Sequence, residues 1–140
     1  MRVLVVVDDL VVRRQVEAAL QKGGFAVVGV ADGLAGWEIL RRADAPRLVV
    51  LDWAVDGMDG PELLARLRAA PNRRATHVLM TSVRSRPEDV AQALDAGADD
   101  YLVKPFHGTE LRARVQAGAR HIAALAALEE RLERRERPAA

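Results

Sequence analysis

The stretch VLVVVDD spans residues 3–9 and joins a run of aliphatic side chains to two carboxylates. The run from Val3 to Val7 has the length of a β-strand and shows no polar alternation. This pattern is typical of a strand that is buried on both faces, as in the interior of a parallel sheet. The sequence therefore predicts an interior parallel strand with Asp8 and Asp9 at its carboxyl end.

The rest of the chain alternates short apolar runs with amphipathic segments. Further runs of strand length occur at residues 25–30, 48–51, 77–80 and 101–103. Helical spacing of apolar residues predicts helices at 11–22 and 34–42, from Pro61 onward, at 85–96, and from Thr109 to well past residue 120. The chain thus contains five predicted strand-helix units.

Local patterns predict which residues of these helices face the core and which residues cap their amino-terminal ends. We expect Leu34, Trp37 and Leu40 to face the core, because they share one side of a helix. Ser85 fits the first position of a capping box, and Thr109 fits an N-cap. Both hydroxyl groups are therefore expected to accept a backbone N–H at the start of a helix.

Strict alternation of strands and helices predicts an α/β fold. Right-handed crossovers place helices on both faces of a parallel sheet, and a closed eight-stranded barrel needs about twice this chain length. We therefore expect an open, five-stranded, doubly wound parallel sheet, with its binding crevice at the carboxyl ends of the strands. Residues 1–120 would form this domain, and residues 121–140 a helical extension or linker.

Composition limits the classes of function. The chain has 140 residues and a net charge of +1 with mixed charges, and aromatic residues make up only 4%. These values disfavour direct binding to nucleic acid. The absence of cysteine excludes disulfides and thiolate metal sites and fits a cytoplasmic location. No apolar run approaches the roughly 20 residues that cross a bilayer, so we expect no membrane span.

Polar residues stand at the carboxyl ends of four predicted strands. Asp8 and Asp9 follow the first strand, and Asp52, Thr81 and Lys104 follow the third, fourth and fifth. Parallel strands end at one edge of the sheet, so these side chains are expected to meet. Clustered carboxylates need a cation, and Mg²⁺ prefers such oxygen ligands. A lysine and a threonine beside them suit a phosphoryl group, with Asp52 as the candidate nucleophile.

Each of these residues also has a structural explanation when it is taken alone. Aspartate at a strand end can cap a helix or open a loop, and threonine is common within strands. Tyr101 fits a half-buried strand aromatic as well as a functional residue. The chain has only two lysines, Lys22 and Lys104, beside many arginines. A lysine kept at a strand end therefore favours a role as a point charge.

The order and spacing of these motifs closely resemble the receiver domain of two-component response regulators, including the chemotaxis regulators. The similarity covers residues 2 to about 118 and includes Asp8-Asp9, Leu51-Asp52, Gly57-Met58-Asp59-Gly60, Thr81 and the stretch from Ala96 to Phe106. The resemblance implies a flavodoxin-like sheet with strand order 2-1-3-4-5. An extended C-terminal helix would follow it.

The resemblance also implies roles at the strand ends. Asp52 would be the phosphoacceptor, and Lys104 would hold the phosphoryl group. Mg²⁺ would be bound by Asp9, Asp52 and the backbone carbonyl of Ala54, and Asp8 would act through water. The chain would assist its own phosphotransfer without being a conventional enzyme.

A conformational switch and a set of partners are implied in the same way. Thr81 would hydrogen-bond the phosphoryl group, and its movement would let Tyr101 swing inward and change the surface of the fourth helix and fifth strand. The Lys104-Pro105 peptide would be cis. The phosphodonor would be a sensor histidine kinase or a phosphotransfer protein. The target would be a downstream protein or a lost output domain.

Two other functions remain as alternatives. A degenerate receiver would bind partners without phosphorylation, although every central residue is present here. A phosphatase with an aspartate nucleophile typically carries a second aspartate two residues later, and this chain has Ala54 at that position. Flavin or nucleotide binding is disfavoured because no glycine-rich loop follows the first strand.

Residues outside the predicted site have simpler expected roles. His77, His107 and His121 are expected to be isolated surface histidines, and Trp53 is expected to border the pocket. The apolar stripe of the last helix continues to Leu132 between alternating charges. The extension would therefore pair with a second copy as a homodimer or lead to an output domain.

Overall fold

Within residues 1–70 and 75–137, which the computed structural model describes, five strands alternate with five helices. The strands are β1 (Arg2–Val6), β2 (Ala26–Val30), β3 (Leu48–Asp52), β4 (His77–Ser82) and β5 (Asp100–Val103). The helices are α1 (Leu10–Lys22), α2 (Gly33–Leu40), α3 (Gly60–Ala69), α4 (Pro87–Asp95) and α5 (Gly108–Glu136). The predicted sequence of elements is confirmed.

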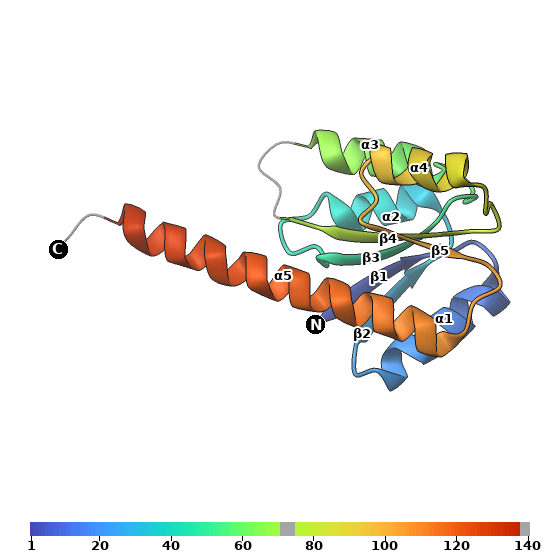
Figure 1. Cartoon of the computed structure of the whole chain (residues 1–140), viewed down its shortest axis with the longest axis horizontal. Helices are drawn as coiled ribbons and strands as arrows, with labels where there is room; N and C mark the ends of the chain where they lie inside the picture. The colour runs from blue at the N-terminus through green and yellow to red at the C-terminus, as the bar shows by residue number, and fades with distance from the viewer. Residues whose placement is uncertain (71–74, 138–140) are drawn as a thin grey trace.

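All five strands run parallel in one open sheet, in the order β2-β1-β3-β4-β5 (Figure 1). The predicted doubly wound sheet and its 2-1-3-4-5 order are confirmed. β3 lies at the centre, where Leu51 pairs with Val6 of β1 and Asp52 pairs with Thr81 of β4. The carboxyl ends of these strands therefore reach the same edge of the sheet.

Helices cover both faces of the sheet, and each face buries its own apolar core (Figure 1). The core under α1 and α5 includes Val5 and Leu111, and the core under α2, α3 and α4 includes Leu4 and Leu63. Neighbouring residues of β1 thus point into different cores. This explains the uninterrupted apolar run, in which each fully buried Val or Leu contributes about 1.5–3 kcal/mol.

The last two helices begin without a side-chain cap. Their N-cap residues are Arg86 and His107, and neither side chain makes a capping hydrogen bond. The predictions that Ser85 and Thr109 cap these helices are therefore wrong. α4 begins later than a Ser85 cap requires, because Pro87 occupies its first turn, where the fixed φ of proline suits a helix. α5 begins before Thr109, which lies inside the first turn.

α2 packs through two glycines, Gly36 against β1 and Gly33 against the loop after β3. Its buried residues are Gly33, Gly36 and Leu40, and Trp37 packs partly buried against the core. Leu34 is 54% exposed, so the prediction that it faces the core is wrong, whereas those for Trp37 and Leu40 are confirmed. A Cβ on Gly36 would lie 3.0 Å from a methyl group of β1. The close approach along the glycine side turns Leu34 outward.

α5 extends beyond the sheet that it covers (Figure 1). Its buried residues are Leu111, Val115, Gly118 and Ile122. Further along, Glu129 forms an ion pair with Arg47, which precedes β3, at 3.2 Å. Leu128 and Leu132 are exposed. None of the helices in the described parts of the chain is long and apolar enough to cross a membrane.

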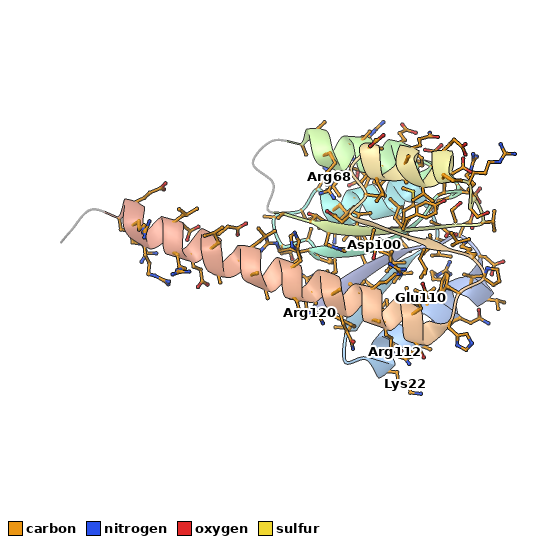
Figure 2. All side chains as sticks on the ribbon, viewed as in Figure 1. Lys22, Arg68, Asp100, Glu110, Arg112 and Arg120 are labelled. Carbon is orange, nitrogen blue, oxygen red and sulfur yellow. The ribbon has the colours of Figure 1, made fainter. Side chains whose placement is uncertain are left out.

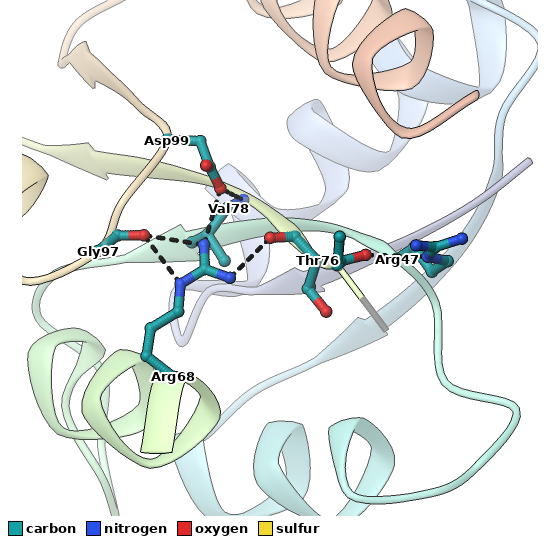
Figure 3. A network of polar contacts seen from close by, with 7 residues as sticks. Arg47, Arg68, Thr76, Val78, Gly97 and Asp99 are labelled. Carbon is teal, nitrogen blue, oxygen red and sulfur yellow. Dashed lines mark hydrogen bonds and ion pairs between the residues drawn. The ribbon is translucent and has the colours of Figure 1, made fainter. Parts of the chain in front are cut away.

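A polar network ties together the segments around the amino-terminal end of β4 (Figure 3). Arg68 of α3 donates to the carbonyl oxygens of Thr76 and Gly97 and to the Asp99 carboxylate, over 2.8–3.0 Å. Asp99 also accepts the N–H of Val78 at 2.7 Å. One guanidinium therefore joins α3, β4 and the turn before β5, at the opposite edge from the carboxyl ends of the strands.

Two histidines meet where α5 crosses the start of β4. The rings of His77 and His121 lie 6.0 Å apart between centroids, at an interplanar angle of 63°. The helix comes close because residue 118 is glycine, where a Cβ would lie 2.6 Å from His77 Nδ1. The prediction of isolated surface histidines is wrong for this pair, and His77 is half-buried, whereas His107 is exposed as expected. Only the folded topology brings His77 and His121 together.

Acidification is expected to destabilise the fold through His77. Burial lowers the pKa of His77 from its ordinary value of 6.5; Asp99 opposes this shift and His121 adds to it. The unfolded chain therefore binds a proton more readily than the folded chain. The contribution of neutral His77 is complete above about pH 6.5 and is lost as the pH falls below it. Urea unfolding at neutral and mildly acidic pH should show a smaller acid-induced loss for His77→Gln than for the wild type; equal losses would contradict this assignment.

Candidate functional site

Asp52 ends the central strand with its carboxylate enclosed, and the residue is only 4% exposed. Lys104 Nζ lies 2.6 Å from Asp52 Oδ2, and the Thr81 hydroxyl donates to Asp52 Oδ1. Each carboxylate oxygen therefore has a donor, one of them charged. Such pairing offsets the cost of burying a charge.

Three neighbouring strands deliver these groups. Asp52 and Thr81 are partners in register on β3 and β4, and Lys104 directly follows β5. The Lys104-Pro105 peptide is cis, as the resemblance implied. The other lysine, Lys22, is exposed at the far end of α1 (Figure 2). Of the two lysines, Lys104 is the one that reaches the carboxylate.

The turn between β1 and α1 carries Asp8 and Asp9. Asp9 Oδ1 accepts the N–H of Val12 at 2.9 Å, so Asp9 caps α1. Arg13 donates to the carbonyl oxygens of Val7 and Asp8 at 2.8 Å and 3.3 Å. The Arg13 guanidinium thus holds the backbone of the acidic turn, a role that sequence analysis missed because nothing distinguishes it from the other arginines.

The oxygen donors at this edge of the sheet are few but suit a metal ion that keeps part of its water shell. Among the residues that the structure describes, no three His, Cys, Asp or Glu side chains are grouped closely enough to hold a metal. Mg²⁺ commonly uses only one or two carboxylates and keeps several waters. Asp52 ends β3, the Asp8-Asp9 turn follows the adjacent strand β1, and Ala54 is exposed in the loop after β3. This oxygen chemistry fits Mg²⁺.

Two aromatic residues pack beside Asp52. Trp53 and Tyr101 are each 8% exposed, and their rings meet edge to face with centroids 6.5 Å apart. The Tyr101 hydroxyl donates to the backbone carbonyl of Arg84 at 2.8 Å, so the ring points inward. The Arg84 guanidinium carbon lies 4.7 Å from the centroid of the Trp53 ring. No pattern in the sequence marked Arg84, because it lies in a loop.

An apolar surface borders the Asp52–Lys104 pair. A cavity of about 640 Å³ lies beside Lys104, between α1 and the start of α5, and its lining includes Val12 and Phe106. Leu10, Val11 and Val83 are exposed nearby at the start of α1 and after β4. Exposed apolar side chains that surround a polar site are typical of a surface that binds another protein.

Comparison with known proteins assigns the chain to a family. Residues 3–116 match the family described as the response regulator receiver domain. The chain belongs to this family. The receiver domain is 44% identical over 115 residues to the transcriptional regulatory protein CseB of Streptomyces coelicolor, covering 82% of this chain and 47% of CseB. It is 37% identical over 125 residues to the transcriptional regulatory protein HprR of Escherichia coli, covering 89% of this chain and 54% of HprR. The chain thus spans about half the length of the curated relatives it matches.

Solved structures of receiver domains share the fold. The receiver domain of the Francisella response regulator 1452 is 30% identical with a TM-score of 0.77, covering 83% of this chain and 93% of that chain. The chemotaxis response regulator CheY4 of Vibrio cholerae is 28% identical with a TM-score of 0.76, covering 83% of this chain and 96% of that chain. The family that the sequence motifs indicated is confirmed.

Proposed function

We propose that this receiver domain accepts a phosphoryl group on Asp52 from the phosphohistidine of a sensor histidine kinase or phosphotransfer protein. The observation that carries the proposal is the buried Asp52 carboxylate, with Thr81 on one oxygen and Lys104 on the other. These are the groups that a phosphoryl transfer needs, namely a nucleophile, a directional donor and a point charge. The reaction would take place in the cytoplasm.

The proposed step replaces one bond to phosphorus by another. An oxygen of Asp52 forms a bond to phosphorus as the P–N bond of the phosphohistidine breaks, and the imidazole nitrogen leaves with the electron pair. Charge on the transferring oxygens is met by the ammonium of Lys104 and the hydroxyl of Thr81, which exchange the carboxylate for the phosphoryl group. The donor would dock on the apolar surface around Leu10 and Val83.

Divalent metal completes the proposed site. Asp9, Asp52 and the carbonyl of Ala54 would hold Mg²⁺, and Asp8 would act through water. The ion would supply charge neutralisation at the transferring oxygens. The chain would thus assist its own phosphorylation and dephosphorylation, rather than act on a separate substrate as a conventional enzyme does.

Phosphorylation would move Thr81 and Tyr101 and so change the α4–β5 surface, to which a downstream protein would bind. Residues 1–120 would form the switching unit, and residues 121–140 would lead to an output domain or pair with a second copy. Leu128 and Leu132 are exposed on this part of α5, where they are free to make such contacts.

Light scattering at tens of micromolar should show a dimer if the α5 helices of two copies pair. A monomer at every concentration would rule out this pairing.

Tryptophan fluorescence tests the proposed phosphoryl site. Mg²⁺ is titrated first, and then beryllofluoride, which stands in for the phosphoryl group. Trp53 directly follows Asp52 and reports on the site, whereas Trp37 on α2 is a constant background. We expect a saturable response that is lost in Asp52→Asn, because the neutral amide lacks the anionic oxygen that binds beryllium.

The absence of a fluorescence response would have to be separated from binding that leaves Trp53 unaffected. Calorimetry guards against a silent Trp53 by measuring the heat of binding directly. A flat fluorescence trace together with the absence of binding heat would overturn the phosphoacceptor proposal. A degenerate receiver that binds its partners without phosphorylation would then be the better explanation.

A further inference from the structure

We propose that Arg84 is a positioning residue that couples the phosphoryl site to the α4–β5 surface. Its guanidinium packs on Trp53, and its backbone carbonyl accepts the hydroxyl of Tyr101. The inference rests on the proposed function, because the coupling matters only if a phosphoryl group reaches Asp52. It adds a residue whose role depends on a three-dimensional contact.

Trp53 is held firmly relative to the phosphoryl site. Its N–H donates to the Thr81 carbonyl at 2.9 Å, and its own carbonyl accepts the N–H of Gly60 at 2.9 Å. It directly follows Asp52, and its ring is nearly buried. A side chain that packs on this ring is therefore positioned relative to both Asp52 and Thr81.

Tyr101 depends on the loop after β4. Its hydroxyl reaches the carbonyl of Arg84, and its ring meets the edge of Trp53. The inward position of Tyr101 therefore requires that the loop keep the carbonyl of Arg84 in place. Whatever fixes residue 84 also stabilises Tyr101 in this position.

Three contacts of the Arg84 side chain and backbone hold this loop in place. The guanidinium carbon lies 4.7 Å from the Trp53 centroid, inside the roughly 6 Å range of a cation–π interaction. The Arg84 N–H donates to Ser82 Oγ at 3.0 Å. An ion pair with Asp89 of α4 adds little, because its 3.9 Å separation is close to the limit for an ion pair and the Arg84 side chain is 54% exposed. The contact with Trp53 is therefore the main side-chain restraint.

The coupling follows from linked equilibria. If phosphorylation favours inward Tyr101, then inward Tyr101 favours the phosphorylated site to the same degree. The Arg84 guanidinium raises the population of inward Tyr101 before any phosphoryl group binds. Without it, the ligand must supply that free energy itself and binds more weakly.

Arg84→Met and Arg86→Met form a matched pair for testing the proposal. Both variants remove one positive charge from the same loop, and Arg86 is exposed and makes no capping hydrogen bond. We expect Arg84→Met to weaken beryllofluoride binding in Mg²⁺ by roughly two- to fivefold, the range of an exposed cation–π contact. The Tyr101 ring resonances should also shift. Arg84→Lys keeps a cation and should restore part of both effects, whereas Arg86→Met should resemble the wild type.

A double-mutant cycle tests the contact without ligand. Urea unfolding of Arg84→Met, of Trp53→Leu and of the double variant should reveal a coupling between the two side chains. The inference is overturned if Arg84→Met matches Arg86→Met in beryllofluoride affinity and Tyr101 resonances, or if the cycle shows no coupling. Failure of the wild type to bind beryllofluoride would instead overturn the proposed function, and the cycle would still report on the contact.

Discussion

Replacing Lys104 by methionine is expected to lower the free energy of unfolding by about 2–4 kcal/mol. The variant leaves the Asp52 carboxylate, which is 4% exposed, without the ammonium that lies 2.6 Å from its Oδ2. Removing one partner of a buried ion pair destabilises a protein strongly, because the remaining charge is unpaired and desolvated. The Lys104 side chain is 23% exposed, so water can reach this end of the pair and moderate the loss.

Two further variants isolate the cause of this loss. Asp52→Asn in the Lys104→Met background removes the unpaired charge and should restore most of the stability. Lys22→Met replaces the exposed lysine at the end of α1 and should change the free energy of unfolding by at most about 0.5 kcal/mol. Equilibrium urea unfolding followed by circular dichroism measures all of them. If Lys104→Met proves as stable as Lys22→Met, the ion pair does not stabilise the fold as described.

The parts of the fold that could be predicted have a direct physical signature. The apolar run from Val3 to Val7 predicted β1 because adjacent residues of an interior parallel strand face two different cores. Asp52, Thr81 and Lys104 were expected at one edge because parallel strands end together, and the structure places them in hydrogen-bonding contact. Alternation alone does not determine which strands are neighbours, so the strand order came from the resemblance to a family.

The features that could not be predicted depend on contacts between distant segments. His77 and His121 meet only because α5 crosses β4 at a glycine. Arg84 stands in a loop where no periodic pattern indicates its neighbours. Leu34 was expected to face the core on the basis of hydrophobicity, but α2 is oriented by the close approach of Gly33 and Gly36. Hydrophobic periodicity depends on large apolar side chains, so it cannot detect a buried helix face that is made of glycines.

Substitution of Gly33 by alanine is expected to cost about 3 kcal/mol of stability, at the upper end of the usual range for overpacking. A Cβ at this position would lie 2.7 Å from the carbonyl carbon of Met58 and still closer to its oxygen. These are backbone atoms of the loop between β3 and α3, and the N–H of Gly33 donates to the Asp56 carbonyl of the same loop at 2.9 Å. The backbone cannot swing away as a flexible side chain can, so α2 or the loop must move.

Gly24→Ala is the matched control for this clash. Gly24 has a φ of +90° and no neighbour within 4 Å, so alanine there costs only backbone strain of about 1 kcal/mol. Because the loop that contains Met58 begins just after Asp52, Gly33→Ala should also weaken the beryllofluoride response, and Gly24→Ala should not. Urea unfolding and the fluorescence titration measure the two effects. The helix propensity of alanine acts in the opposite direction, because alanine normally stabilises a helix relative to glycine by about 1 kcal/mol. If Gly33→Ala is more stable than the wild type, the helix propensity outweighs the clash, and the contact between Gly33 and the Met58 backbone does not restrict this position.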